Sequence, residues 1–462
     1  MPLIIPSSSI SAGGYEVDNS LRFNDGSSDT LQRSPASASN RRTWTWSGWI
    51  KRCTIGTYQV IFVGGTANTW IRFKDNDELE FNIQDNDEST TATTQLFRDV
   101  SAWYHIVVAI DTTQGTASNR VKFYVNGSQV TSFSTSVYPS LNYEAGINNT
   151  GTHFIGRLNY VAVQYIDMYL SEVCFIDGQQ LDPTSFGEFD SATGIWKPID
   201  VSGLTFGTNG FYLDFENSGS LGADVSGNGN NFTVNNLTAI DQSTDTCTNN
   251  FATWNRLIPP TFTNHNLLDG NLTVEGETSS QNTAFSTFAV SSGRWFCEMK
   301  LTVEGNATSS VPNFGIASTA DFKHADSEAY YESSGTNIYA GRVNSAQINR
   351  NGSDSGTDLS DTPDVGDIMG LALDLDSGTK TLKFYLNGSL VGTVNINTDE
   401  YCFICAVKED NNKATVQGNF GGTNTYTVSS GNADGNGRGN FEYAVPSGYL
   451  SLCTKNLSEV LG

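Results

Sequence analysis

Lys122-Phe-Tyr-Val-Asn-Gly-Ser128 and Lys383-Phe-Tyr-Leu-Asn-Gly-Ser389 are two heptapeptides that match at six of seven positions. Aromatic and β-branched residues favour a pleated strand, and Asn-Gly is the strongest short signal for a tight hairpin turn. Each heptapeptide follows an apolar segment that ends in aspartate. The repeat therefore predicts two copies of one antiparallel supersecondary unit, placed in two related domains.

The residues around the first heptapeptide show further strand patterns. Residues 103–110 are apolar at successive positions, which predicts a central strand that is buried on both faces. Within residues 42–50, alternation places Trp44 and Trp46 on one face, whereas Trp49 breaks the pattern and Gly48 indicates a bulge. More strands are expected at 70–74, 79–83, 121–125, 153–156, 171–176 and 211–215. A short turn or helix is expected at Asp182-Pro183.

The residues around the second heptapeptide repeat this layout. Strands are expected at 293–301, 313–317, 367–374 and 382–386. We therefore predict an all-β protein with two antiparallel sandwiches joined by a Gly/Asn-rich connector. The expected parts are an N-terminal arm (1–17), a first sandwich (18–190), the connector (191–265), a second sandwich (266–420) and a C-terminal tail (421–462). The tail is expected to pack back on the second sandwich, as an extended lid at 441–449.

The composition excludes several classes of function. The formal net charge of −24 would repel a phosphate backbone, so nucleic-acid binding is not expected. No apolar window is long enough to span a membrane, and the N-terminus lacks the basic and apolar regions of a secretion signal. The chain has seven cysteines, an odd number, which we interpret as free thiols.

Specific motifs resemble known families. Residues 18–190 resemble the laminin-G-like, concanavalin A-type jelly roll, through the segments 44–50, 103–110, 123–127 and 172–178. Residues 285–420 resemble a SPRY domain, through Gly293-Arg-Trp-Phe-Cys-Glu298, Asn313-Phe-Gly-Ile316, and the run from Gly366 to Asp376 before Phe384-Tyr-Leu-Asn-Gly388. Both resemblances imply a sandwich of two antiparallel sheets.

The whole layout also resembles structural proteins of marine bacteriophages, which are usually described as tail-fibre-like. The shared features are Ser20-Leu-Arg-Phe23, the Arg41–Trp49 run, the segment from Asn209 to Ala252 and the tail from Pro446 to Leu457. This resemblance implies a protein of the virion surface, assembled with other virion proteins and as a homo-oligomer. Two functions stay open: recognition of a host-surface glycan, or an architectural role as a decoration, knob or adaptor on the capsid or tail.

Few residues suggest catalysis or metal binding. A glucanase of this sandwich class needs opposed carboxylates, but Glu78 and Glu80 share one strand face at a hairpin and lack a third partner. We therefore expect no enzyme activity and assign no catalytic residue, cofactor or metal. The acidic clusters at 75–78, 85–88 and 224–231 could hold Ca²⁺, although Asp and Asn are also common turn residues.

The histidines and the Cys402/Cys405 pair are expected to be structural. His105 lies in an apolar strand, and positions 402 and 405 would face opposite sides of a strand. The other histidines, His153, His265 and His324, are isolated from one another.

Three aromatic residues could stack on a sugar or simply pack within the sandwich: Trp70, Tyr143 and Tyr160.

Overall fold

The computed structural model divides the chain into two compact units. We call residues 11–248 the N-terminal unit and residues 249–462 the C-terminal unit. The structure describes residues 14–65, 69–83, 89–257, 265–277, 282–304, 312–320, 337–343, 345–351, 353–407 and 413–461. Most of the arm expected at 1–17 lies outside these ranges. Its described end contacts the N-terminal unit itself, where Val17 N donates to Thr248 Oγ1 (3.1 Å).

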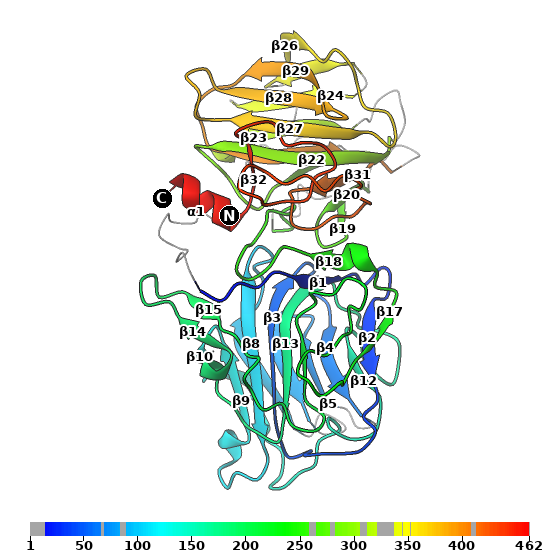
Figure 1. Cartoon of the computed structure of the whole chain (residues 1–462), viewed down its shortest axis with the longest axis vertical. Coiled ribbons are helices and arrows are strands. Elements are labelled where there is room, and N and C mark those ends of the chain that lie inside the picture. Colours follow the sequence, from blue (N-terminus) through cyan, green and yellow to red (C-terminus); the bar gives the residue numbers. More distant parts are fainter. Residues whose placement is uncertain are drawn as a thin grey trace. The chain divides into compact units, whose positions relative to one another are not determined.

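Two antiparallel sheets form the N-terminal unit (Figure 1). The first sheet contains β1 (Ser20–Phe23), β3 (Thr43–Arg52), β8 (Trp103–Asp111), β9 (Val121–Val125), β10 (Ser128–Gln129), β13 (Met168–Asp177), β16 (Phe211–Leu213) and β18 (Gln242–Ser243). Its order is β10-β9-β8-β3-β13-β1-β18, and β16 also pairs with β13.

The second sheet contains β2 (Thr30–Arg33), β4 (Gln59–Gly64), β5 (Thr69–Phe73), β6 (Glu78–Asn82), β7 (Thr90–Leu96), β11 (Phe133–Ser136), β12 (His153–Ile155) and β17 (Thr233–Asn235). Its order is β11-β7-β6-β5-β4-β12-β2-β17.

The core of the N-terminal unit lies between these sheets. Trp44 and Trp46 of β3 are fully buried in it, together with Ile71 and Phe81 of the second sheet. The prediction that the two tryptophans share a face is confirmed. The central strand predicted at 103–110 is β8, which lies between β9 and β3.

The predicted bulge at Gly48 lies on the neighbouring strand instead. The register between β3 and β8 is continuous at Gly48, but the register between β3 and β13 shifts between Ser171 and Cys174. Glu172 takes up the extra residue with a φ of 52°. Trp49 keeps the alternation, because it packs on the outer face of the sheet, with its ring 4.9 Å from that of His105.

The connector expected at 191–265 is corrected by the structure, because most of it belongs to the N-terminal unit. Strands β16 and β18 belong to the first sheet, and β17 belongs to the second. Strand β14 (Gly187–Phe189) pairs with β15 (Trp196–Pro198) as a separate hairpin. Lys51 of β3 forms a buried ion pair with Asp245 (2.7 Å). Short strands in a Gly- and Asn-rich segment carry little local signal, so only their distant partners define them.

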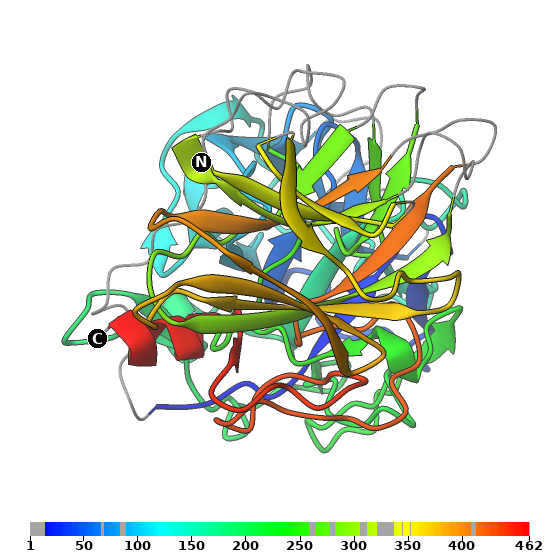
Figure 2. The same ribbon diagram turned by 90° about the horizontal axis from the view of Figure 1, so that it is seen from above.

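The C-terminal unit also has two sheets, which Figure 2 shows as separate layers. The first contains β19 (His265–Leu268), β20 (Thr273–Gly276), β22 (Arg294–Val303), β27 (Ile368–Asp374), β28 (Thr381–Leu386), β29 (Ser389–Asn395), β31 (Thr415–Asn419) and β32 (Leu450–Ser451). The second contains β21 (Asn282–Phe285), β23 (Asn313–Ser318), β24 (Ile338–Arg342), β25 (Gln347–Arg350), β26 (Ser353–Asp358) and β30 (Tyr401–Val407). Their orders are β19-β20-β31-β22-β27-β28-β29 and β21-β30-β23-β24-β25-β26, and β32 pairs parallel to β22.

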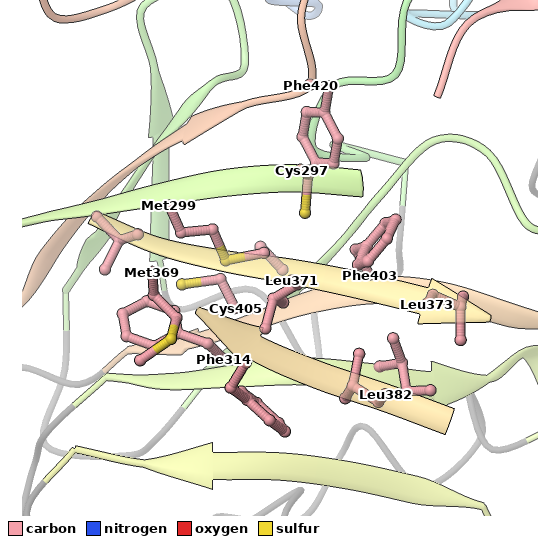
Figure 3. Close-up of a cluster of buried hydrophobic side chains, with 14 of the residues drawn as sticks. Cys297, Met299, Phe314, Met369, Leu371, Leu373, Leu382, Phe403, Cys405 and Phe420 are labelled. Carbon is pink, nitrogen blue, oxygen red and sulfur yellow. The ribbon is translucent and has the colours of Figure 1, made fainter. Parts of the chain in front are cut away.

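Side chains from both sheets fill the core of the C-terminal unit (Figure 3). Met369, Leu371 and Leu373 project from one face of β27 toward Phe314 and Phe403 of the other sheet. The all-β prediction is thus confirmed, with one core between each pair of sheets.

The cysteines are structural, as expected. All seven are free thiols, which lie at positions 53, 174, 247, 297, 402, 405 and 453. Cys405 faces the core between the sheets, whereas Cys402 belongs to a separate cluster with Phe285 and Ile338. The two side chains therefore lie on opposite faces of β30.

The tail expected at 421–462 packs on the C-terminal unit. Phe441 and Tyr449 cover Phe296 and Ala372 on the outer face of the sheet. Both carboxylate oxygens of the buried Glu298 accept hydrogen bonds from the tail, at 2.9 Å from the backbone N of residue 442 and 2.8 Å from that of residue 443.

The other regular elements are short helices. They are the 3-10 helices η2 (Ala117–Asn119), η3 (Pro183–Ser185) and η4 (Ala239–Asp241), and the α-helix α1 (Thr454–Leu461). The turn or helix predicted at Asp182-Pro183 is η3. None of the helices in the described residues is long and apolar enough to cross a membrane.

The two repeated hairpins have the same geometry. Asn126 and Asn387 have φ angles of 46° and 47°, and the following Gly127 and Gly388 have angles of 77° and 80°. Each asparagine makes two hydrogen bonds to the strand that pairs with the strand before the turn, which is β8 for Asn126 and β27 for Asn387. Its backbone N donates to the carbonyl of His105 or Ile368 (2.9 Å each). Its side-chain oxygen accepts a hydrogen bond from the backbone N of His105 (2.8 Å) or Ile368 (3.0 Å).

An aromatic ring from a later segment covers each turn. A Cβ atom added at Gly127 would lie 2.2 Å from the ring of Trp196, and one added at Gly388 would lie 2.8 Å from the ring of Tyr443. Glycine is therefore required at both positions, both for its positive φ and for the close approach of a ring.

Candidate functional site

The outer face of the second sheet of the N-terminal unit carries an apolar cluster that is separate from the core. Phe154 of β12 pairs with Val63 of β4, and Val63 pairs with Trp70 of β5, so the three side chains form a row across the sheet. Val60 and Leu158 complete this cluster. Strand alternation explains the row, because neighbouring residues such as Ile71 face the core.

Polar contacts fix Trp70 and its neighbours on this face. Trp70 Nε1 donates to Glu80 Oε1 (3.1 Å), and Arg72 Nε donates to the same oxygen (2.7 Å). The Arg72 guanidinium lies over the rings of Tyr58 and Trp70, at 4.6 Å from each centroid. It also donates to Gln164 Oε1 (3.4 Å), which connects the sheet to the loop that follows β12.

A pocket opens to solvent beside this cluster. Its volume is about 380 Å³, which is within the range of small-molecule sites. Its lining residues are Gly65, Thr152, Phe154, Asn159 and Tyr160. The walls therefore combine two aromatic side chains with a hydroxyl and an amide, as a saccharide would require.

Asn159 presents an unused acceptor in this pocket. Its Nδ2 donates to the carbonyl of Gly65. Its Oδ1 is buried and accepts no hydrogen bond from any of the described residues. Gly65 has a φ of 75°, and an added Cβ would lie 2.2 Å from the carbonyl oxygen of Gly146, so this close backbone approach depends on glycine. A buried oxygen without a donor favours a ligand that supplies one.

The loop from Arg157 to Gln164 presents apolar side chains next to the pocket. Tyr160 is 62% exposed, and Val161 and Val163 are each 45% exposed. The loop is fixed by backbone hydrogen bonds, from Leu158 N to the carbonyl of Val163 (3.1 Å) and from Val60 N to that of Gln164 (3.0 Å). A fixed loop with exposed apolar side chains is typical of a binding surface.

The structure separates the three aromatic residues singled out in the sequence. Trp70 packs with Phe154, and Phe154 and Tyr160 line the pocket together. Tyr143 packs against the core of the N-terminal unit, so the packing interpretation is right for that residue. The sequence analysis missed Phe154 and Asn159. Alternation along β12, with the buried His153 and Ile155 on the other face, is the signal that could have placed Phe154 outside.

Glu78 and Glu80 both form ion pairs with basic side chains. Glu80 pairs with Arg72, and Glu78 pairs with Lys74 (2.9 Å). Burial opposes ionisation of Glu78, but hydrogen bonds from Lys74 and Asn76 outweigh it and lower the pKa of this carboxyl. A lowered pKa favours the ionised form, which cannot donate a proton as a general acid.

Carboxylates of the acidic clusters at 75–78 and 224–231 accept hydrogen bonds from backbone N–H groups and from arginine side chains. Asp77 accepts hydrogen bonds from Arg52, Arg98 and the backbone N of Gly56. Asp224 accepts from three backbone N–H groups, of residues 212, 226 and 230. Within the described part of the chain, no group of three acidic, histidine or cysteine side chains could hold a metal. The cluster at 85–88 lies outside the described residues.

His105 and His153 are buried, hydrogen-bonded and neutral. His105 contacts Ser47 Oγ through Nε2 (2.9 Å) and accepts from Trp196 Nε1 at Nδ1 (3.0 Å). His153 accepts from the backbone N of Asn148 at Nε2 (3.0 Å). Burial lowers the pKa of His105 to about 3 and that of His153 to about 4. The structural interpretation of His105 is confirmed. His265 lies in β19, and His324 is outside the described residues.

We expect the N-terminal unit to lose stability in mild acid through these two histidines. Both folded pKa values lie below the usual histidine pKa of 6.5, so the unfolded chain binds more protons than the folded unit below that pH. Each histidine then lowers the free energy of unfolding by about 1.4 kcal/mol per pH unit, from about pH 6.5 down to its folded pKa. Urea unfolding between pH 7 and pH 4.5 would measure this slope.

His105→Gln provides the control for that prediction. Glutamine does not titrate, so the variant should be less stable at pH 7 but should show a shallower dependence on pH between 6.5 and 4.5. Equal slopes for the variant and the wild type would contradict the assignment of the acid response to His105.

Comparisons with known proteins agree with the fold of the N-terminal unit. Residues 25–179 match a family model described as the concanavalin A-like lectin/glucanases superfamily. No curated protein matches the chain.

Solved structures of three kinds are similar to parts of the chain. The SPRY domain of human HERC1 shares 13% identity with this chain and has a TM-score of 0.29. The match covers 36% of this chain and 95% of the HERC1 domain. Domains LG4-5 of the mouse laminin alpha1 chain share 12% identity, cover 88% and 85% of the two chains, and have a TM-score of 0.29. A putative carbohydrate-binding protein from Bacteroides ovatus shares 16% identity, covers 48% and 59%, and has a TM-score of 0.29. The stretch that resembles the lectin/glucanase superfamily thus runs from the start of β2 to the end of β13 and contains every residue of the pocket.

Proposed function

We propose that this protein binds a carbohydrate, without catalysis, through the pocket beside β12. The observation that carries this proposal is the pocket itself, whose lining includes Phe154, Tyr160 and Asn159; the side-chain oxygen of Asn159 has no donor among the described residues. Aromatic faces bind the apolar faces of sugars, and single polar groups bind their hydroxyls. The two carboxylates that could suggest hydrolysis are paired with Arg72 and Lys74.

We further propose that the protein is a tail-fibre-like component of a bacteriophage virion surface, that it assembles there with other virion proteins and as a homo-oligomer, and that the carbohydrate belongs to the host surface. This proposal rests on the resemblance of the Arg41–Trp49 run and the tail at 446–457 to phage structural proteins. Mass spectrometry of purified phage particles tests it, and absence of the protein from the particles would contradict it.

A glycan array should detect binding by the full chain, and Tyr160→Ala should weaken it by about tenfold. Loss of one exposed stacking ring removes about 1–1.5 kcal/mol of aromatic contact, and 1.4 kcal/mol corresponds to a tenfold change in affinity. Titration with the best saccharide from the array would measure the affinities.

Phe189→Ala is the matched control for Tyr160→Ala. Phe189 is an exposed aromatic residue (53%) of the same unit and does not line the pocket. It should leave saccharide binding unchanged. Equal losses of saccharide affinity in both variants would contradict the assignment of binding to this pocket. Absence of binding to any saccharide would favour the purely architectural role.

A further inference from the structure

Arg157 places a positive charge beside the pocket. Its guanidinium carbon lies 4.1 Å from the centroid of the Phe154 ring, and Phe154 lines the pocket. No carboxylate of the described residues lies within ion-pair distance of Arg157. The Nε atom of Arg157 is buried and has no hydrogen-bond partner among the described residues. The ring of Phe154 thus supports a guanidinium that forms no ion pair with a carboxylate of the described residues.

The neighbouring arginine on this face is in the opposite state. Arg72 is paired with Glu80 at 2.7 Å, and both side chains are mostly buried. This pair contributes little net charge to the pocket, either positive or negative. None of the five lining residues is an acid or a base other than the phenol of Tyr160. Among the described residues, Arg157 is therefore the charge beside the pocket that these contacts leave without a counter-ion.

The overall charge of the protein does not cancel this local effect. The chain carries a formal net charge of −24, which would repel an anion at long range. In 0.15 M salt, however, exposed charges separated by more than about 8 Å are largely screened. A guanidinium that stacks on a ring keeps its N–H donors in its own plane, where they match the two oxygens of a carboxylate. At contact distance, the pairing with Arg157 outweighs the screened repulsion.

We infer that the pocket selects acidic saccharides, with the carboxylate of a uronic or similar acid on Arg157 and a sugar face on Tyr160. A hydroxyl of the same sugar would donate to Asn159 Oδ1, which has no donor among the described residues. This inference rests on the proposed function, since it names the class of carbohydrate for the same site. A sulfated saccharide shares the negative charge but lacks the planar two-oxygen group that fits the guanidinium fork.

Paired polysaccharides that differ only in charge test the inference. The probes are polygalacturonate and its methyl ester, hyaluronan and its carboxyl-reduced form, and dextran sulfate and dextran. The wild-type chain should bind at least one of the two carboxylate polymers about tenfold more tightly than its neutral partner, because a hydrogen-bonded charge pair contributes about that factor. This preference should decrease as NaCl is raised.

Two arginine variants separate a local effect from a general one. Arg157→Gln should bind the acidic and the neutral partner equally, and its affinity for the neutral polymer should equal that of the wild type. Arg350→Gln is the matched control, because Arg350 also lies over a ring, that of Tyr339 (5.7 Å), but in the C-terminal unit. It makes the same change in net charge and should keep the preference of the wild type.

The outcomes distinguish this inference from the proposed function. If the wild type binds saccharides but does not prefer the carboxylate polymers, or prefers dextran sulfate, the inference is overturned and the carbohydrate site stands. A preference that persists in Arg157→Gln also overturns it. If the wild type binds no saccharide, charged or neutral, in these pairs or on the array, the proposed function fails and the inference fails with it.

Discussion

Replacing Lys51 with methionine should lower the free energy of unfolding of the N-terminal unit by about 3–5 kcal/mol. Lys51 Nζ lies 2.7 Å from Asp245 Oδ2, and both side chains are only 1% exposed. Asp245 also accepts from Trp103 Nε1 (3.1 Å). Removal of the ammonium takes the lysine cation away from a buried carboxylate, and a neutral donor such as the Trp103 indole cannot replace that charge.

Urea unfolding followed by tryptophan fluorescence would measure this loss. Six of the eight tryptophans lie in residues 11–248, so the signal reports mainly the N-terminal unit. The double variant Lys51→Met/Asp245→Asn should recover most of the stability, because it buries no charge. Lys197→Met is the control: the Lys197 side chain is 25% exposed and pairs with the exposed Glu188 as well as with Asp190, so the loss should be much smaller. Equal losses for both lysines would contradict the argument from burial.

The second large effect is expected for Gly127→Ala, which should destabilise the N-terminal unit by about 2–4 kcal/mol. A left-handed conformation costs an L-residue about 1–2 kcal/mol, and overpacking a close contact adds about 1–3 kcal/mol. A more restricted unfolded chain offsets about 0.4–1 kcal/mol of this. The backbone at Gly127 has a φ of 77°, and the added methyl group would overlap the ring of Trp196.

Two other glycines separate these causes. Gly227 has a φ of 89° but has open space where a Cβ would stand, so Gly227→Ala measures backbone strain alone. Gly203 has open space and no positive φ, so Gly203→Ala should be nearly neutral. In urea unfolding, the loss in free energy of unfolding should be largest for Gly127→Ala, smaller for Gly227→Ala and smallest for Gly203→Ala. If Gly127→Ala were no worse than Gly227→Ala, the contact with Trp196 would not restrict this turn.

The parts of the fold that could be predicted are those that carry local signals. Asn126-Gly127 requires positive φ angles that few other dipeptides tolerate, and the alternation of Trp44 and Trp46 identifies the buried face of β3. By contrast, β18 contains only two residues, and its partner Ser20 lies more than two hundred residues earlier. No local pattern encodes such a pairing, so the segment at 191–265 could be mistaken for a connector.

The candidate site was predictable only in part, for a similar reason. Trp70 and Tyr160 could be named from the sequence, as aromatic residues able to stack on a sugar. The importance of Phe154 depends on the register of β12 with β4, which places Phe154 opposite Val63. The role of Arg157 depends on the fold of the loop that returns its guanidinium over the ring of Phe154. Such relations arise from tertiary structure, not from spacing along the chain.

The ion pair between Lys51 and Asp245 also has a consequence for synthesis on the ribosome. The two residues are separated by 194 positions. At about 5–20 residues per second, translation needs roughly 10–40 s to reach Asp245 after Lys51 has been made. Throughout that interval the nascent chain contains Lys51 but not the counter-ion for its buried ammonium, and the strands β8, β13, β16 and β18 of the same sheet are added one after another. The first sheet of the N-terminal unit and its buried ion pair can therefore be completed only near the end of the translation of this unit, after β18 and Asp245 have been made.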